Sequence, residues 1–168
     1  MAIPETLVNF NLTVDGKGYA GIVQSATTPK LVLKSEEYRA GGMDAPIDID
    51  QGMEKLDASF DLNGWQTDVL AFFGLSNGSA FSGVLRGAFR DATGTVKALV
   101  VTYRGMLKSV DPGDWSAGDK SMTKFDVNCR YYKAEVDGQV LYELDLIGGI
   151  RIINGVDQMA AVRAALGT

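Results

Sequence analysis

A glycine-rich segment is the first candidate for chemistry. Residues 16–21 match the pattern G-x-G-x-x-G, in which glycines let a turn approach the pyrophosphate of a dinucleotide. Such a site needs a helix directly after the glycines, because the helix N-terminus binds the phosphates. Residues 22–29 are instead rich in β-branched side chains and end at Pro29, which is typical of a strand. We therefore expect a hairpin turn at Asp15 and Gly16 rather than a dinucleotide site.

Acidic residues provide two further candidates. Residues 48–52 resemble the start of a calcium-binding loop, but position 12 of that loop is Ser59 where a glutamate is required. A structural turn or a β-bulge is the favoured interpretation. A pair drawn from the 21 acidic residues could hydrolyse a glycosidic bond. No aromatic cluster singles out one pair, so we expect these acids to lie on a solvated face.

The absence of histidine removes several kinds of catalytic site. The chain has no histidine and one cysteine, Cys129. Nucleophilic triads, histidine acid–base chemistry, imidazole metal sites and multi-cysteine zinc sites are therefore excluded. Cys129 occupies an apolar position of a predicted strand, which indicates a buried structural thiol. We expect no enzyme, no cofactor and no metal site.

Composition and charge indicate a globular chain that does not capture nucleic acid. The chain has 168 residues, of which 46% are hydrophobic, and its net charge is −5. This length predicts one domain over residues 1–168. A general nucleic-acid binder carries a basic patch, whereas an acidic surface lets DNA pass without binding it. We expect no signal peptide at residues 1–7 and no membrane-spanning segment.

Alternation of apolar and polar residues predicts long strands. Residues 123–135 alternate over their whole length, and Asp137 and Gly138 then form a strong hairpin signal before a second alternating run. Residues 96–110 form another long strand, entered through a turn at residues 92–94. Long strands with open edges normally pair with another chain, so we expect the sheet to close across subunits.

The apolar positions change parity within residues 47–62. Ile47 and Ile49 occupy odd positions, whereas the later apolar residues occupy even ones. One strand with a bulge at Gly52 would absorb this change. Two polar faces result from the alternation here and in residues 123–135. Their members, which we take as candidates for lining a channel, are Lys55, Asp57, Ser59, Asp61, Lys124, Asp126, Asn128 and Arg130.

Residues 30–38 predict a strand, and the connection after it is unusual. Residues 39–46 are rich in glycine and carry an arginine and a methionine. Long hairpins with such tips often act as interaction arms.

Trp115 lies in a turn at residues 111–115 and has two interpretations. It is either an exposed binding residue or, as we favour, a tryptophan that covers an edge of the core.

Two helices are predicted. Apolar spacing over residues 65–75 indicates an inner helix that ends at Gly74. Residues 156–166 indicate a C-terminal helix, with Asn154 and Asp157 as candidate caps. The apolar stripe of the second helix either packs on its own sheet, which we favour, or joins a contact between subunits. This stripe consists of Val156, Met159, Val162 and Leu166. The fold class is mainly β: a β-sandwich or barrel subunit with one inner α-helix and a short C-terminal helix.

Several motifs resemble one family along nearly the whole chain. They occupy residues 3–7, 38–46, 72–75, 110–115, 131–133, 135–138 and 153–158. In these segments the chain resembles the major tail tube proteins of contractile-tailed phages, a family that includes the inner tube proteins of R-type bacteriocins (tailocins). The combination of residues 38–46 with residues 111–115 is the most specific part of the resemblance.

The resemblance implies a structural subunit of a tail tube. Family members form hexameric rings that join their strands into one β-barrel, and the rings stack inside a contractile sheath. The implied partners are the sheath, the tape-measure protein, baseplate or initiator and terminator proteins, and DNA in transit. The implied location is the virion tail or tailocin particle, assembled in the host cytoplasm. The loop that would reach neighbouring subunits consists of Tyr38, Arg39, Ala40, Gly41, Gly42, Met43, Asp44, Ala45 and Pro46.

Other functions stay open at this point. One alternative is a monomeric β-sandwich that binds a carbohydrate or small ligand, and another is an enzyme on a β-barrel scaffold. The tube ring of a type VI secretion system would share the architecture. Six subunits at −5 each would give a ring a charge of −30, which disfavours non-specific capture of DNA.

Overall fold

The computed structural model describes residues 4–168, so Ile3 of the motif at residues 3–7 lies outside the described residues. The chain is mainly β, as predicted. The strands are β1 (Thr6–Val14), β2 (Lys17–Gly18), β3 (Val23–Thr27), β4 (Leu33–Tyr38), β5 (Ile47–Met53), β6 (Leu56–Asn63), β7 (Phe81–Arg90), β8 (Val96–Asp111), β9 (Met122–Val136), β10 (Gln139–Asp145), β11 (Ile150–Ile153) and β12 (Val156–Asp157). The helices are α1 (Thr67–Leu70) and α2 (Ala160–Leu166).

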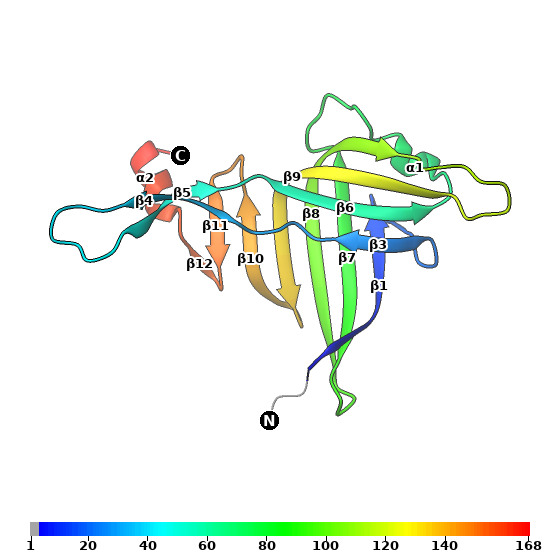
Figure 1. The fold of residues 1–168 in the computed structure, drawn as a ribbon, viewed down its shortest axis with the longest axis horizontal. Coiled ribbons are helices and arrows are strands. Elements are labelled where there is room, and N and C mark those ends of the chain that lie inside the picture. Colours follow the sequence, from blue (N-terminus) through cyan, green and yellow to red (C-terminus); the bar gives the residue numbers. More distant parts are fainter. Residues whose placement is uncertain (1–3) are drawn as a thin grey trace.

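Two layers of strands cross each other, and β8 and β9 belong to both (Figure 1). The eight-stranded layer has the order β12-β11-β10-β9-β8-β7-β1-β2. The four-stranded layer has the order β3-β6-β9-β8, because the first half of β9 pairs with β6 and the second half pairs with β10. Bulges let a strand change layers in this way. Here the bulge is at Arg130, which lies between the pairs Arg104–Tyr131 and Gly105–Cys129.

The core lies between the two layers. The apolar positions of β6 are fully buried, and Phe60 stacks on Phe125 at 5.0 Å and on Phe81 at 5.7 Å between ring centroids. Cys129 is buried, as predicted. Beside it, Gly105 allows β8 and β9 to approach closely, since a Cβ on Gly105 would lie 2.0 Å from the backbone oxygen of Asn128.

The hairpin turns agree with the sequence. Asp15 and Gly16 both have positive φ, at 47° and 82°, and so do Asp137 and Gly138, at 49° and 81°. These angles are those of type I′ turns, which match the twist of the flanking strands. No helix follows residues 16–21, because the chain continues into β3. The geometry needed for dinucleotide binding is therefore missing here.

The expected continuous strand over residues 47–62 is wrong. The chain forms two strands, β5 and β6, which pair with different partners. The bulge at Gly52 is present: Lys34 of β4 lies opposite both Gln51 and Gly52. Gly52 has a φ of 101° and donates its N–H to Asp50 Oδ1 at 2.7 Å. The change of parity therefore marks a strand that leaves the core.

Both helices are shorter than predicted. α1 has four residues, and the following residues form turns up to Gly74, whose φ is 72°. α2 begins at Ala160, because Val156 and Asp157 form β12 instead. Neither predicted cap is the N-cap of α2, which is Met159 without a side-chain hydrogen bond. Asn154 is a turn residue with positive φ, and Asp157 accepts the N–H of Met159 at 2.9 Å before the helix begins. Within residues 4–168, neither helix has the length and apolar character needed to cross a bilayer.

The favoured packing of the C-terminal stripe is also wrong. Val156, Val162 and Leu166 are exposed, and no residue of α2 is buried. Arg163 holds the short helix in place, donating to Asp157 Oδ2 at 2.5 Å and to the backbone oxygen of Gly149 at 2.9 Å. Polar contacts rather than apolar burial therefore attach α2 to the sheet.

Candidate assembly surfaces

The outer side of the four-stranded layer is a polar face. The register of β6 and β9 places Asp57 opposite Asn128, Ser59 opposite Asp126, and Asp61 opposite Lys124. The alternating side chains of the same strands fill the core. The structure thus brings together the two polar sets that the sequence predicted separately.

Hydrogen bonds and ion pairs engage the carboxylates of this face. Asp57 accepts bonds from Lys108 at 2.9 Å and Asn128 at 3.1 Å, and Lys55 lies 3.2 Å away. Partial burial on its own would raise the pKa of Asp57, but these three donors outweigh it and lower the pKa to about 2. The carboxylate therefore stays charged and paired at neutral pH.

The other two aspartates of the face also have donors. Ser25 of β3 donates to Asp61 at 2.6 Å, and Ser109 of β8 donates to Asp126 at 2.9 Å. Lys108 and Ser109 were not predicted for this face. Simple alternation would place these adjacent residues on opposite sides of β8, but a bulge between Leu107 and Ser109 brings both to the aspartates. The face carries charges of both signs, and it includes Asp111 of β8, which lies opposite Lys124. Its lysines and aspartates are Lys55, Lys108, Lys124, Asp57, Asp61, Asp111 and Asp126.

Arg130 does not continue the row formed by Lys124, Asp126 and Asn128. It is the extra residue of the β9 bulge, and a Cβ on Gly78 would lie 2.1 Å from its Nη2. The guanidinium thus lies over the loop that precedes β7. Beyond the bulge the row continues with Tyr131, whose ring lies 4.2 Å from the Arg104 guanidinium.

The four-stranded layer has two unpaired edges. Within residues 4–168, β3 pairs only with β6. The pairing of β7 with β8 ends at Phe81 and Gly105, so the rest of β8, up to Asp111, pairs only with β9. Each neighbouring pair in the layer is antiparallel, so β3 and β8 run in opposite directions. A strand edge of this kind offers backbone donors and acceptors to another chain.

The predicted interaction arm is a two-stranded hairpin that projects from the body (Figure 1). It consists of β4, β5 and a tip at residues 39–46, and every residue of β4 is exposed. Its two faces differ. Tyr38 lies opposite Ile47 on an apolar face, whereas Glu37 lies opposite Asp48 on an acidic face. An exposed hairpin is marginally stable alone, so contacts elsewhere must support it.

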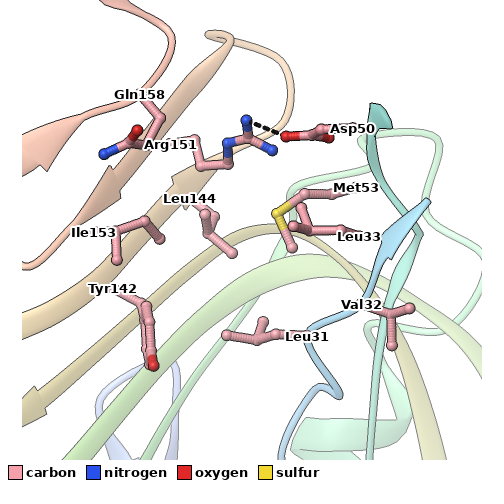
Figure 2. Close-up of a pocket in the computed structure, with 10 residues that line it drawn as sticks. All are labelled: Leu31, Val32, Leu33, Asp50, Met53, Tyr142, Leu144, Arg151, Ile153 and Gln158. Carbon is pink, nitrogen blue, oxygen red and sulfur yellow. Dashed lines mark hydrogen bonds and ion pairs between the residues drawn. The ribbon is translucent and has the colours of Figure 1, made fainter. Parts of the chain in front are cut away.

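One ion pair joins the base of the arm to the eight-stranded layer. Arg151 of β11 donates from Nη2 to Asp50 Oδ2 at 2.7 Å (Figure 2). The hydrogen bond from Arg151 and a second from the Gly52 N–H lower the pKa of Asp50. Beneath the pair is a cavity of about 400 Å³ between the arm base and β10–β11, with walls that include Met53 and Leu144. Six of the ten lining residues are aliphatic side chains or methionine, and the polar ones include the Asp50–Arg151 pair itself, so the lining is suited to packing.

Comparison with known proteins decides the family. Residues 4–167 match the family described as phage tail tube protein FII. The tail tube protein of Escherichia phage P2 is 33% identical, with 99% of both chains covered. The major tail tube protein of Serratia phage KSP20 is 34% identical, over 89% of this chain and 88% of that one. The chain belongs to the phage tail tube family. It is a structural subunit of a tail tube.

Solved structures share the fold of this tail tube protein. A chain of the extracellular contractile injection system PVC, in a sheath–tube complex, has a TM-score of 0.59 at 11% identity. The match covers 80% of this chain and 91% of that one. A PVC sheath/tube terminator matches with a TM-score of 0.62 at 10% identity, over 80% of this chain and 98% of the other. At this level of identity the likeness concerns the fold alone.

A pair of tryptophans marks the opposite end of this tail tube protein from the arm. Trp65 and Trp115 meet edge to face, with 5.9 Å between ring centroids and 82° between ring planes. The expectation that Trp115 covers an edge of the core is wrong, because its side chain packs on Trp65 and is 75% exposed. A hollow of about 300 Å³ lies beside the two rings.

Proposed function

We propose that six copies of this chain form a ring, and that stacked rings form the inner tube of a contractile tail or tailocin. The observation that carries the proposal is the four-stranded layer with two free edges. Because β3 and β8 are antiparallel, β8 of one copy can pair with β3 of the next in the ordinary antiparallel manner. Six such layers would close a continuous barrel, which removes both open edges of each four-stranded layer.

In this ring the polar face lines the lumen. Its residues are those named in the sequence analysis, apart from the displaced Arg130: Lys55, Asp57, Ser59, Asp61, Lys124, Asp126 and Asn128. Interspersed charges of both signs, several of them bonded to one another, give a wall that neither holds nor strongly repels a polyanion. The tape-measure protein or DNA can then pass without sticking. The role is structural rather than catalytic.

The other partners follow from the same arrangement. The sheath covers the outside of the tube, while baseplate or initiator and terminator proteins meet its two ends. The loop at residues 38–46 reaches neighbouring subunits. Assembly takes place in the cytoplasm of the host, and the product is part of the virion tail or tailocin particle. One domain spanning residues 1–168 suffices for these roles.

Negative-stain electron microscopy with light scattering on the same concentrated sample tests the proposal. Six-fold rings or hollow tubes are the expected result. A strict monomer at every concentration, which also fails to polymerise when baseplate extract is added, would contradict it. That outcome would favour the alternative of a monomeric ligand-binding β-sandwich.

A further inference from the structure

The arm and the tryptophan pair lie at opposite ends of the four-stranded layer. β6 begins at Leu56, shortly after the arm, and ends at Asn63, next to Trp65. β8 likewise ends at Asp111, just before Trp115. Figure 1 shows the arm leaving one end of β3 and β6, with the β8–β9 loop beyond the other end. Copies placed head to tail along these strands would therefore bring one arm next to another copy's tryptophans.

The tryptophan end has the character of a binding surface. Trp115 is 75% and Trp65 50% exposed, which leaves two of the largest apolar side chains in water. Tryptophan in a hollow is typical of the residues that dominate the energy of protein interfaces. The carboxylates of Asp114 and Asp119 line the same hollow, together with Lys120. A planar cation is the group best matched to aromatic rings flanked by carboxylates.

The arm tip carries such a cation. Arg39 is exposed and is the only basic residue in residues 39–46. Its Nε donates to the backbone oxygen of Met43 at 3.3 Å, which holds the side chain against the tip and leaves the two Nη atoms without a hydrogen-bond partner among residues 4–168. Met43 adds a flexible apolar side chain that can pack on an indole ring.

The arm is long enough to cross a boundary between copies. From Leu33 to Tyr38 the extended chain spans about 20 Å, at roughly 3.3 Å per residue, and the tip extends further. The eight residues of β6 span about 26 Å on the same scale. The tip therefore overlaps much of the next layer along the strand direction.

We propose that the arm tip of one copy docks in the Trp65–Trp115 hollow of a copy in the adjacent ring. Arg39 lies against the indole rings and pairs with Asp114 or Asp119, while Met43 packs beside them. The contact is heterologous, so each ring offers arms on one side and hollows on the other, and stacking continues without limit. This proposal rests on the proposed function, because it needs stacked rings.

Disulfide trapping in assembled tubes tests the contact. Gly41 has no atom within 4 Å of its added Cβ, and Ser116 is exposed beside Trp115, so Gly41→Cys with Ser116→Cys introduces two accessible thiols. The native cysteine, Cys129, is buried and should not form a disulfide in this experiment. The matched control keeps Gly41→Cys and adds Thr93→Cys, in the exposed turn between β7 and β8. After mild oxidation, we expect a ladder of disulfide-linked multimers on a non-reducing gel. The amount of linked chain should be at least about ten-fold greater than in the control.

The outcomes separate this contact from the proposed function. Tubes without the ladder, or with an equal ladder in the control, overturn the docking and leave the tube intact; the hollow would then be free for another partner, such as the sheath. If the unsubstituted chain forms neither rings nor tubes, even when baseplate extract is added, both proposals fail.

Charge reversal keeps the test valid if the cysteine variants do not assemble. Arg39→Glu should lower the yield of tubes at least about ten-fold, while rings persist. Adding Asp119→Arg or Asp114→Arg should restore tubes in at least one case. Normal tubes from Arg39→Glu alone, or no restoration by either second change, would overturn the docking.

Discussion

Arg151 and Asp50 form an ion pair across 101 positions of the sequence, with 2.7 Å between Nη2 and Oδ2. The pair connects β11 to the base of an arm that otherwise has little support from the body. Arg151 is mostly covered, with 18% of its side chain exposed, whereas Asp50 lies nearer to solvent. Arg151, from the C-terminal part of the sheet, therefore supports the position of the arm together with the apolar packing of Leu31 and Met53 on the core.

Arg151→Gln should loosen the arm without unfolding the protein. The expected result is faster hydrogen exchange in β4 and β5 and faster proteolysis at residues 39–46, because the arm loses its charged anchor. The core strands should keep their protection. Lys34→Gln is the control, since this exposed lysine on β4 has no part in the pair. Unchanged exchange in the arm of Arg151→Gln would show that apolar packing around Met53 and Leu144 suffices.

Asp57 should make the four-stranded layer sensitive to acid. Its pKa is lowered from 3.8 to about 2 in the folded protein, so the folded state favours the charged form. The stabilisation is complete above about pH 4 and is lost as the pH falls from there towards 2. The side chain is 35% exposed, so the effect should be about 1 kcal/mol after allowance for solvent screening.

Urea unfolding at pH 5 and pH 2.5 measures this effect, and a carboxyl NMR titration gives the pKa directly. Asp57→Asn should reduce the difference in stability between the two pH values. Asp44→Asn, at the exposed arm tip, should leave it unchanged. A titration midpoint of Asp57 near 4 would contradict the hydrogen-bonded arrangement.

Gly105→Ala should disrupt the crossing of β8 and β9. The new methyl group would lie 2.0 Å from the backbone oxygen of Asn128, so the strands must separate next to the bulge at Arg130. We expect a loss of about 3 kcal/mol or more, or insoluble protein, because backbone cannot yield as a flexible side chain does. Gly41→Ala, with open space around the added Cβ, is the control and should unfold like the parent protein. Equal stability of the two variants would show that the strands can move apart at little cost.

Cys129 should be unreactive in the folded protein. Burial raises the pKa of its thiol to about 12, so almost none is thiolate at neutral pH. A thiol reagent such as DTNB should label it at least a hundred-fold more slowly in buffer than in denaturing urea. Rapid labelling under native conditions would mean that β9 separates from its neighbours on the timescale of the reaction.

Local signals in the sequence predicted much of the fold. The alternation in residues 123–129 matches the burial pattern of β9, because the side-chain period of a strand depends on its own backbone. The predicted parity is wrong beyond the bulge at Arg130, where Tyr132 and Ala134 are buried in place of Tyr131. The turn at Asp137 and Gly138 was also predictable, since positive φ at two successive residues is a local preference. The predicted length of the inner helix was wrong: apolar spacing suggested eleven residues, whereas α1 has four.

The rest of the fold depends on contacts between distant segments. Two polar faces were evident in the sequence, but only the β6–β9 register places Asp57 beside Asn128, with Lys108 added from β8. Alternation continues formally to Arg130, yet a bulge removes this residue from the row, because β8 and β9 change layers there. The sequence likewise predicted an exposed arm, whereas its anchor at Arg151 lies 101 positions away.

The sequence by itself determined the strands, the turns between them, the absence of histidine chemistry and the glycine-rich tip of the arm. These features arise from backbone preferences and side-chain periodicity within short segments. The tertiary structure alone decided which edges stay unpaired, where Arg151 anchors the arm and why Trp65 and Trp115 remain exposed together. These features depend on pairing and packing between residues far apart in the chain, and no local pattern encodes those distances.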